Sequence, residues 1–193
     1  MTEKYIIAMC GIPGSGKSET SKRLGQKLKI NALNPDTFRK KYIYPYVKNR
    51  VINGKWQSFH KDNIIDKQWY SCAEKEILNG NSVIMDATFH IYEKRKKLYR
   101  LKDKLGCGLL FIHCVCGERT AISRMKKLER LGKKTFRNNI NGLVMAYSST
   151  YEEVSKDSEK PSTLEYNTET EKLKKYNIRD SKFIDQIVKI LSE

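Results

Sequence analysis

The sequence predicts an α/β fold in which a five-stranded parallel sheet is flanked by helices. Short apolar runs alternate with longer helical patterns, and the first run leads through a glycine-rich turn into a helix. Alternating strands and helices are typical of parallel sheets, because parallel neighbours need a crossover connection. The 193 residues show no internal repeat, low-complexity linker or second-domain boundary, so we expect a single domain over 1–193.

The expected elements alternate along the chain. Apolar runs of strand character cover 5–10, 30–33, 82–85, 108–116 and 162–166. Helical patterns cover 19–28, 62–78, 91–105, 118–131 and 136–153, and a last helix capped by Asp180 runs to Leu191. We expect the helix over 136–153 to pack outside the sheet.

The turn after the first expected strand carries a phosphate-binding motif, G-x-x-x-x-G-K-[ST], followed by a helix that begins near Glu19. The motif consists of Gly11, Ile12, Pro13, Gly14, Ser15, Gly16, Lys17 and Ser18. Its glycines let backbone N–H groups point inward around an anion, and the end of the following helix adds positive potential. We expect Lys17 to reach the β- and γ-phosphates of ATP and Ser18 to bind Mg²⁺.

Polar residues follow the next two expected strands. Asp36 and Arg39 come after the second strand, and Asp86 and Thr88 after the third. Ligands of open α/β sheets bind beyond the carboxyl ends of the strands, so these residues should face the same crevice as the phosphate loop. Asp36 also suits the N-cap of a short helix. Asp86 belongs to a magnesium shell or an acceptor site, or else it caps the end of the strand.

Arg95 falls within the apolar face of the helix expected over 91–105. A guanidinium group in that position needs a partner. The partner is either a structural carboxylate or a bound phosphate, and the sequence leaves both open.

The basic segment over 117–137 is predicted to form a helical lid that closes arginines over the triphosphate. Arg124 lies at the edge of the apolar stripe of its helix, while Arg130 projects away from that stripe. The alternative is a solvated charged face, which accounts for Lys126 and Lys127 but poorly for Arg124.

The formal net charge of +16 exceeds what a triphosphate site needs. This charge favours a nucleic-acid partner over the alternative of a lysine-rich solubilising surface. Residues 40–60 interleave aromatic and basic side chains, and either line an acceptor groove or form a small satellite core.

Five cysteines without a C-x-x-C pair indicate reduced thiols and, with no apolar leader or membrane-length run, a cytoplasmic protein. His113 and Cys114 are neighbours in an expected strand and point to opposite faces, which argues against a zinc site there.

Three segments taken together resemble one family. GIPGSGKS, NPDTFR and VIMDATF followed by Arg95 are similar to the kinase domain of polynucleotide 5′-hydroxyl kinases, among the small phosphate-loop kinases. The resemblance covers about residues 4–147 and implies ATP, Mg²⁺ and a nucleic acid with a free 5′-hydroxyl end. One departure is Phe89, which stands where the family often carries asparagine in D-x-T-N.

The resemblance also implies roles for individual residues. Asp36 corresponds to the general base that takes the proton from the attacking 5′-hydroxyl, and Arg39 to the arginine that holds the phosphate next to the acceptor nucleoside. Asp86 corresponds to the second essential aspartate. A lid arginine, either Arg124 or Arg130, contacts the transferred phosphate.

Two other functions stay open on sequence alone. A kinase of a small metabolite or nucleotide sugar would share the loop and the base. A nucleic-acid-binding ATPase would release free phosphate, but the acceptor clamp suggested by Asp36 and Arg39 argues against it.

Overall fold

The computed structural model describes residues 3–42, 61–132 and 139–193 and contains a mixed sheet of strand order β2-β3-β1-β4-β5-β6. The strands are β1 (Tyr5–Cys10), β2 (Asn31–Leu33), β3 (Val83–Asp86), β4 (Gly108–Val115), β5 (Ser162–Asn167) and β6 (Leu173–Tyr176). The first five run parallel, as predicted, and β6 adds an antiparallel sixth strand. The expected five-stranded parallel sheet is therefore confirmed and extended at one edge.

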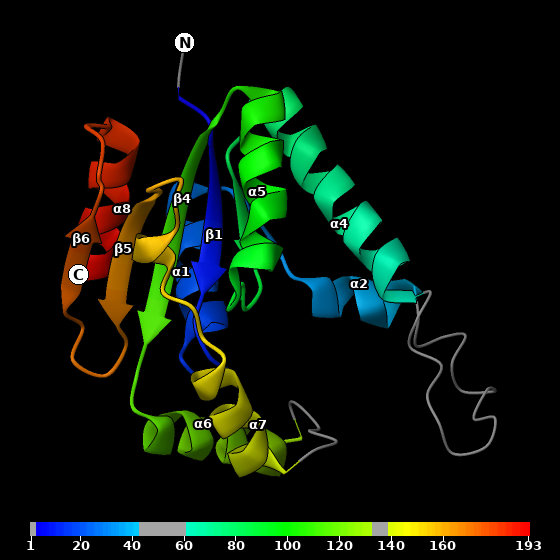
Figure 1. The fold of residues 1–193 in the computed structure, drawn as a ribbon, viewed down its shortest axis with the longest axis vertical. Helices are drawn as coiled ribbons and strands as arrows, with labels where there is room; N and C mark the ends of the chain where they lie inside the picture. The colour runs from blue at the N-terminus through cyan, green and yellow to red at the C-terminus, as the bar shows by residue number, and fades with distance from the viewer. Residues whose placement is uncertain (1–2, 43–60, 133–138) are drawn as a thin grey trace.

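Helices cover both faces of this sheet (Figure 1). They are α1 (Lys17–Leu28), α2 (Pro35–Tyr42), α4 (Lys61–Leu78), α5 (Tyr92–Leu105), α6 (Glu118–Arg130), α7 (Ile140–Ser149) and α8 (Lys182–Ser192). A short 3₁₀ helix, η1 (Val154–Lys156), precedes β5. On one face α4 and α5 pack against the core, and on the other face α1 and α8 do so.

The alternation of side chains along β1 explains how the two cores share a central strand. Ile6 and Ala8 belong to the core under α4 and α5, whereas Ile7 and Met9 belong to the core under α1 and α8. All four are fully buried. A strand buried on both faces reads as a continuous apolar run, which is why β1 was recognisable in the sequence.

Helices α6 and α7 form a separate pair beyond the carboxyl ends of the strands (Figure 1). Their contact is a small apolar cluster that includes Ala121, Met125, Ile140 and Val144, with Ile12 of the phosphate loop packed against it. The second helix was expected to pack outside the sheet, and the structure places its apolar stripe against α6. Helix α6 is the main described part of the lid expected over 117–137, and α7 packs against it.

The cap of the last helix also differs from the expectation. The last helix is capped by Ser181, whose Oγ accepts a hydrogen bond from the Ile184 N–H at 3.5 Å, and not by Asp180. Most of the aromatic and basic segment over 40–60, and part of the expected lid loop, lie outside the described residues. None of the described helices has the length and apolarity needed to cross a membrane.

Candidate active site

The phosphate loop curls between β1 and α1 in a conformation that needs glycine. Gly11 has φ 133° and Gly14 has φ 82°, in the region that side chains with a Cβ rarely adopt. A Cβ on Gly14 would lie 2.4 Å from the backbone oxygen of Ala121, so the lid helix α6 sits directly on the loop. The phosphate loop and the lid helix are therefore in direct contact with each other.

Lys17 begins α1 and directs its ammonium group into the curl of the loop. Its Nζ donates to the Ile12 carbonyl oxygen at 2.7 Å and lies 3.5 Å from Ser15 Oγ, and the residue is buried. The cation thus occupies the centre of the predicted anion site. Pro13, Ser15 and Gly16 form the rest of the curl, and Glu19 lies in the first turn of α1.

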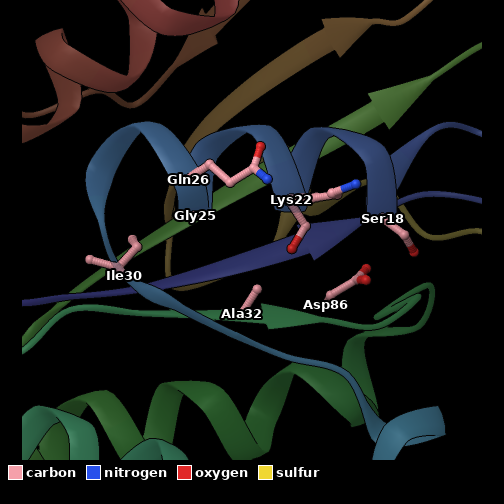
Figure 2. Close-up of a pocket in the computed structure, with 8 residues that line it drawn as sticks. Ser18, Lys22, Gly25, Gln26, Ile30, Ala32 and Asp86 are labelled. Carbon is pink, nitrogen blue, oxygen red and sulfur yellow. The ribbon is translucent and has the colours of Figure 1, made fainter.

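Ser18 and Asp86 meet at the mouth of this loop. Ser18 lies in the first turn of α1 and Asp86 ends β3, and both line an open cavity of about 350 Å³ between α1 and the strands β2 and β3 (Figure 2). Asp86 is buried and accepts a hydrogen bond from Asn34 Nδ2 at 2.8 Å.

This pair of oxygen ligands fits Mg²⁺, which prefers one or two carboxylates together with substrate phosphates. Across the described ranges no group of three His, Cys, Asp or Glu side chains could hold a metal by itself. Ser18 and Asp86 would therefore hold the ion together with the nucleotide.

Asn34 connects the two strand ends that carry the predicted acceptor residues. Its Oδ1 accepts from the Asp36 N–H at 2.8 Å while its Nδ2 donates to Asp86. Asn34 therefore caps α2, and the expectation that Asp36 is the cap is wrong. The sequence could have identified Asn34 as the cap, because asparagine is a preferred N-cap residue and proline, here Pro35, is favoured at the first helical position.

Asp36 lies in the first turn of α2 and is partly exposed. Arg39 follows three positions later in the same helix, and its side chain lies outside the described part of the structure. Only Asn34 separates β2 from α2, so Asp36 lies two positions after the residue that anchors Asp86.

Thr88 touches the phosphate loop through its backbone. Its carbonyl oxygen accepts from the Gly11 N–H at 3.2 Å, and its hydroxyl lies 3.4 Å from His90 Nδ1. Phe89, which replaces the family's asparagine, is buried and stacks on Trp69 with ring centroids 5.7 Å apart. The residue at that position therefore contributes to the core.

Arg95 forms a structural ion pair. It is fully buried, and its Nε and Nη2 donate to the two carboxylate oxygens of Asp157 at 2.7 and 2.6 Å. Nη1 donates to the Phe89 carbonyl oxygen at 2.9 Å, and Tyr99 also hydrogen-bonds Asp157. Of the two alternatives for Arg95, the structure favours the carboxylate, and the substrate role is not supported.

The two lid arginines are placed differently. Arg124 reaches back to the turn between β5 and β6, where its guanidinium donates to Thr168 Oγ1 at 2.7 Å and to the Thr168 carbonyl oxygen at 3.0 Å. Arg130 is exposed at the end of α6. Because Thr168 also hydrogen-bonds the Ser15 carbonyl oxygen at 2.9 Å, Arg124 lies next to the phosphate loop and Arg130 does not share that connection.

The buried cysteines Cys10 and Cys114 and the imidazole of His113 are neutral at physiological pH. Burial raises the pKa of the Cys114 thiol to about 12 and the pKa of Cys10 beyond that. Burial also lowers the pKa of His113 to about 4, against a smaller opposing effect of Glu165. These groups cannot act as an ionised nucleophile or a cation, so the charge at the loop comes from Lys17.

The fold is shared with kinases of known structure. An inferred kinase from Chloroflexus aurantiacus aligns with a TM-score of 0.67 at 17% identity, over 98% of this chain and 96% of that one. The Mycobacterium tuberculosis APS kinase CysC, in complex with AMPPNP and APS, aligns with a TM-score of 0.59 at 15% identity over all of both chains. A chain of the Pnkp1/Rnl/Hen1 RNA repair complex aligns with a TM-score of 0.62 at 16% identity, over 78% of this chain and 44% of that one.

No curated protein matches the chain in sequence. A family model, described as an AAA domain, matches residues 6–145 and so covers the phosphate loop, the strand ends and most of the lid. The solved structures add that the architecture is an α/β phosphate-loop kinase fold with a mostly parallel sheet. The chain belongs to this AAA domain family.

Proposed function

We propose that the protein transfers the γ-phosphoryl group of ATP to a hydroxyl, and that the acceptor is the 5′-hydroxyl end of a nucleic acid. The observation that carries the proposal is the junction at Asn34, which ties Asp86 at the mouth of the phosphate loop to the helix that carries Asp36 in its first turn. A carboxylate placed in this way could take the proton of an attacking acceptor hydroxyl.

Each residue has a distinct part in the proposed reaction. Lys17 and the loop N–H groups hold the triphosphate, and Asp36 accepts the proton of the attacking hydroxyl. Arg124 stabilises negative charge on the transferred group, since its guanidinium is already held next to the loop. Mg²⁺, held by Ser18 and Asp86, would neutralise charge on the phosphates.

The basic surface of the lid supports a polyanionic acceptor. Arg119, Lys126, Lys127 and Arg130 are exposed on α6, beside the phosphate loop that α6 covers. In the parts of the chain that the structure describes, none of these four takes part in an ion pair closer than 4.0 Å. Such cations attract phosphates more strongly than paired ones do.

The test is transfer of labelled γ-phosphate from ATP to a panel of 5′-hydroxyl DNA and RNA oligonucleotides and small alcohols. We expect labelled oligonucleotide, and we expect Lys17→Ala to lower the rate at least about a hundredfold because charge stabilisation of the transferred group is lost. Lys27→Ala is the matched control, since Lys27 lies on the same helix, 59% exposed, and pairs with Glu193 on the surface.

Two results would contradict the proposal. Transfer to a small alcohol in preference to every oligonucleotide would indicate the metabolite or nucleotide-sugar kinase. Release of free phosphate with no labelled acceptor would indicate the nucleic-acid-binding ATPase.

A further inference from the structure

The turn between β5 and β6 contacts both the phosphate loop and the lid helix α6. No sequence motif identifies this turn. The Thr168 hydroxyl donates to the Ser15 carbonyl oxygen at 2.9 Å, across a sequence separation of 153 residues. A Cβ on Gly16 would lie 3.1 Å from the Thr168 side chain, so the turn packs closely on the phosphate loop.

The same hydroxyl also receives the lid arginine. Arg124 Nη1 donates to Thr168 Oγ1 at 2.7 Å, and Nη2 donates to the Thr168 carbonyl oxygen at 3.0 Å. A hydroxyl can donate one hydrogen bond and accept others, so Thr168 can hold the loop and the arginine at once. The Thr168 N–H fixes the turn itself by donating to the Val115 carbonyl oxygen at 2.9 Å.

Glu169 holds the start of the lid helix. Its carboxylate accepts from the Gly117 N–H at 2.7 Å and from the Thr120 hydroxyl. Gly117 precedes the first residue of α6, where unpaired N–H groups favour a carboxylate. These hydrogen bonds, with the nearby Arg124 charge, lower the pKa of Glu169, so it is ionised at neutral pH.

We propose that Thr168 and Glu169 are positioning residues that hold the lid helix and Arg124 against the phosphate loop. The proposal rests on the proposed function, because it assigns Arg124 to the bound triphosphate. Thr168 fixes the guanidinium at the loop, and Glu169 fixes the first turn of the helix that carries it. A group that is fixed before binding loses less conformational freedom on binding, which strengthens its contact with the phosphates.

The experiment is a double-mutant cycle on the affinity for a non-hydrolysable ATP analogue with Mg²⁺, measured by titration calorimetry. We expect Arg124→Ala to raise Kd about tenfold, as for a lost charge-assisted hydrogen bond. Thr168→Val keeps the shape of the side chain but removes its hydroxyl, and should raise Kd about threefold to tenfold. In the Arg124→Ala background the valine should change Kd by less than about twofold.

Two further variants separate positioning from folding. Thr168→Ser retains the hydroxyl and should restore Kd to within about twofold of the wild type. Thr170→Val lies in the same turn with an exposed side chain, and should leave Kd unchanged. Thermal unfolding of each variant checks that the fold is intact.

The binding measurements test the positioning role of Thr168 and Glu169 independently of the proposed phosphotransfer. Additive effects of Thr168→Val and Arg124→Ala, or an unchanged Kd in Thr168→Val, would overturn it. If the wild-type protein binds the analogue but phosphorylates no acceptor, the proposed function fails while the cycle still decides the positioning role. If the wild-type protein does not bind the analogue, both are wrong.

Discussion

At the scale of single residues, the buried ion pair of Arg95 with Asp157 is a contact whose loss should be strongly destabilising. Removing one partner would leave an uncompensated charge in the core beside Phe89, whose φ is 40° and whose carbonyl Arg95 holds. The ion pair therefore also fixes the loop that contains Phe89. Thr88, the residue before Phe89, accepts a hydrogen bond from the Gly11 N–H of the phosphate loop.

We expect Asp157→Ala to lower the free energy of unfolding by about 3–5 kcal/mol, because the guanidinium loses its counter-ion in a buried site. Urea denaturation measures this. The double variant Arg95→Met, Asp157→Leu should recover most of the loss, since no charge is left buried. Lys96→Met is the control: its pair with Glu93 is exposed and contributes less than about 1 kcal/mol. A loss in Asp157→Ala as small as in the control would contradict the assignment.

His113 makes stability depend on pH. Its ring stacks on Tyr151 at 4.6 Å and lies 3.9 Å from Glu165, and burial lowers its pKa from 6.5 to about 4. The unfolded chain therefore binds a proton near pH 6.5 that the folded protein does not bind until about pH 4. The contribution of neutral His113 to stability is therefore fully present above pH 6.5 and falls as the pH decreases toward 4.

Because of this difference in pKa, the free energy of unfolding should fall by about 1–2 kcal/mol between pH 7 and pH 5. His113→Phe, which keeps an aromatic ring against Tyr151, should lose less stability than the wild type over the same interval. Urea denaturation at both pH values tests the difference. Equal pH dependence in the two proteins would show that His113 does not titrate as described.

At the scale of elements, the sequence was informative wherever the determinants are local. The phosphate loop and β1 could be predicted because glycine conformations, helix start and apolar run lie in one short stretch. Helix α7 was recognised without its partner: Ile140 and Val144 define an apolar stripe, but the stripe does not identify α6 as the element that covers it. Strand β6 was missed because its central residues are exposed lysines, which protect a sheet edge and mask the strand pattern.

The candidate site shows the same division. Lys17, Ser18 and Asp86 were predictable because each adjoins a strand or loop with a clear pattern. Thr168 and Asn34 were not, since their roles depend on side-chain contacts with segments far away in the chain. Arg95 was flagged by its place on an apolar face, but its partner lies 62 residues further on and only the fold identifies it.

At the scale of the whole molecule, the net charge of +16 is not evenly compensated. Among the described residues, four lysines of α5 are paired with carboxylates: Lys96 with Glu93, Lys97 with Asp66, Lys102 with Asp103, and Lys104 with Glu74. The exposed cations of α6 have no such partners there. The exposed cations of the lid are therefore available to attract a polyanion toward the phosphate loop that α6 covers.

Binding of a nucleic-acid acceptor to this basic surface should depend on the salt concentration. Each phosphate held by a lysine or arginine releases condensed counterions on binding, so KM for an oligonucleotide should rise steeply with ionic strength. With a few such contacts, we expect an increase of about tenfold or more between 50 and 200 mM salt, measured at saturating ATP. A nucleoside or small alcohol acceptor is the control, since it lacks these phosphates and its KM should hardly change. An oligonucleotide KM as flat as that of the control would mean that the basic surface does not contact the acceptor, and would favour a small-molecule substrate.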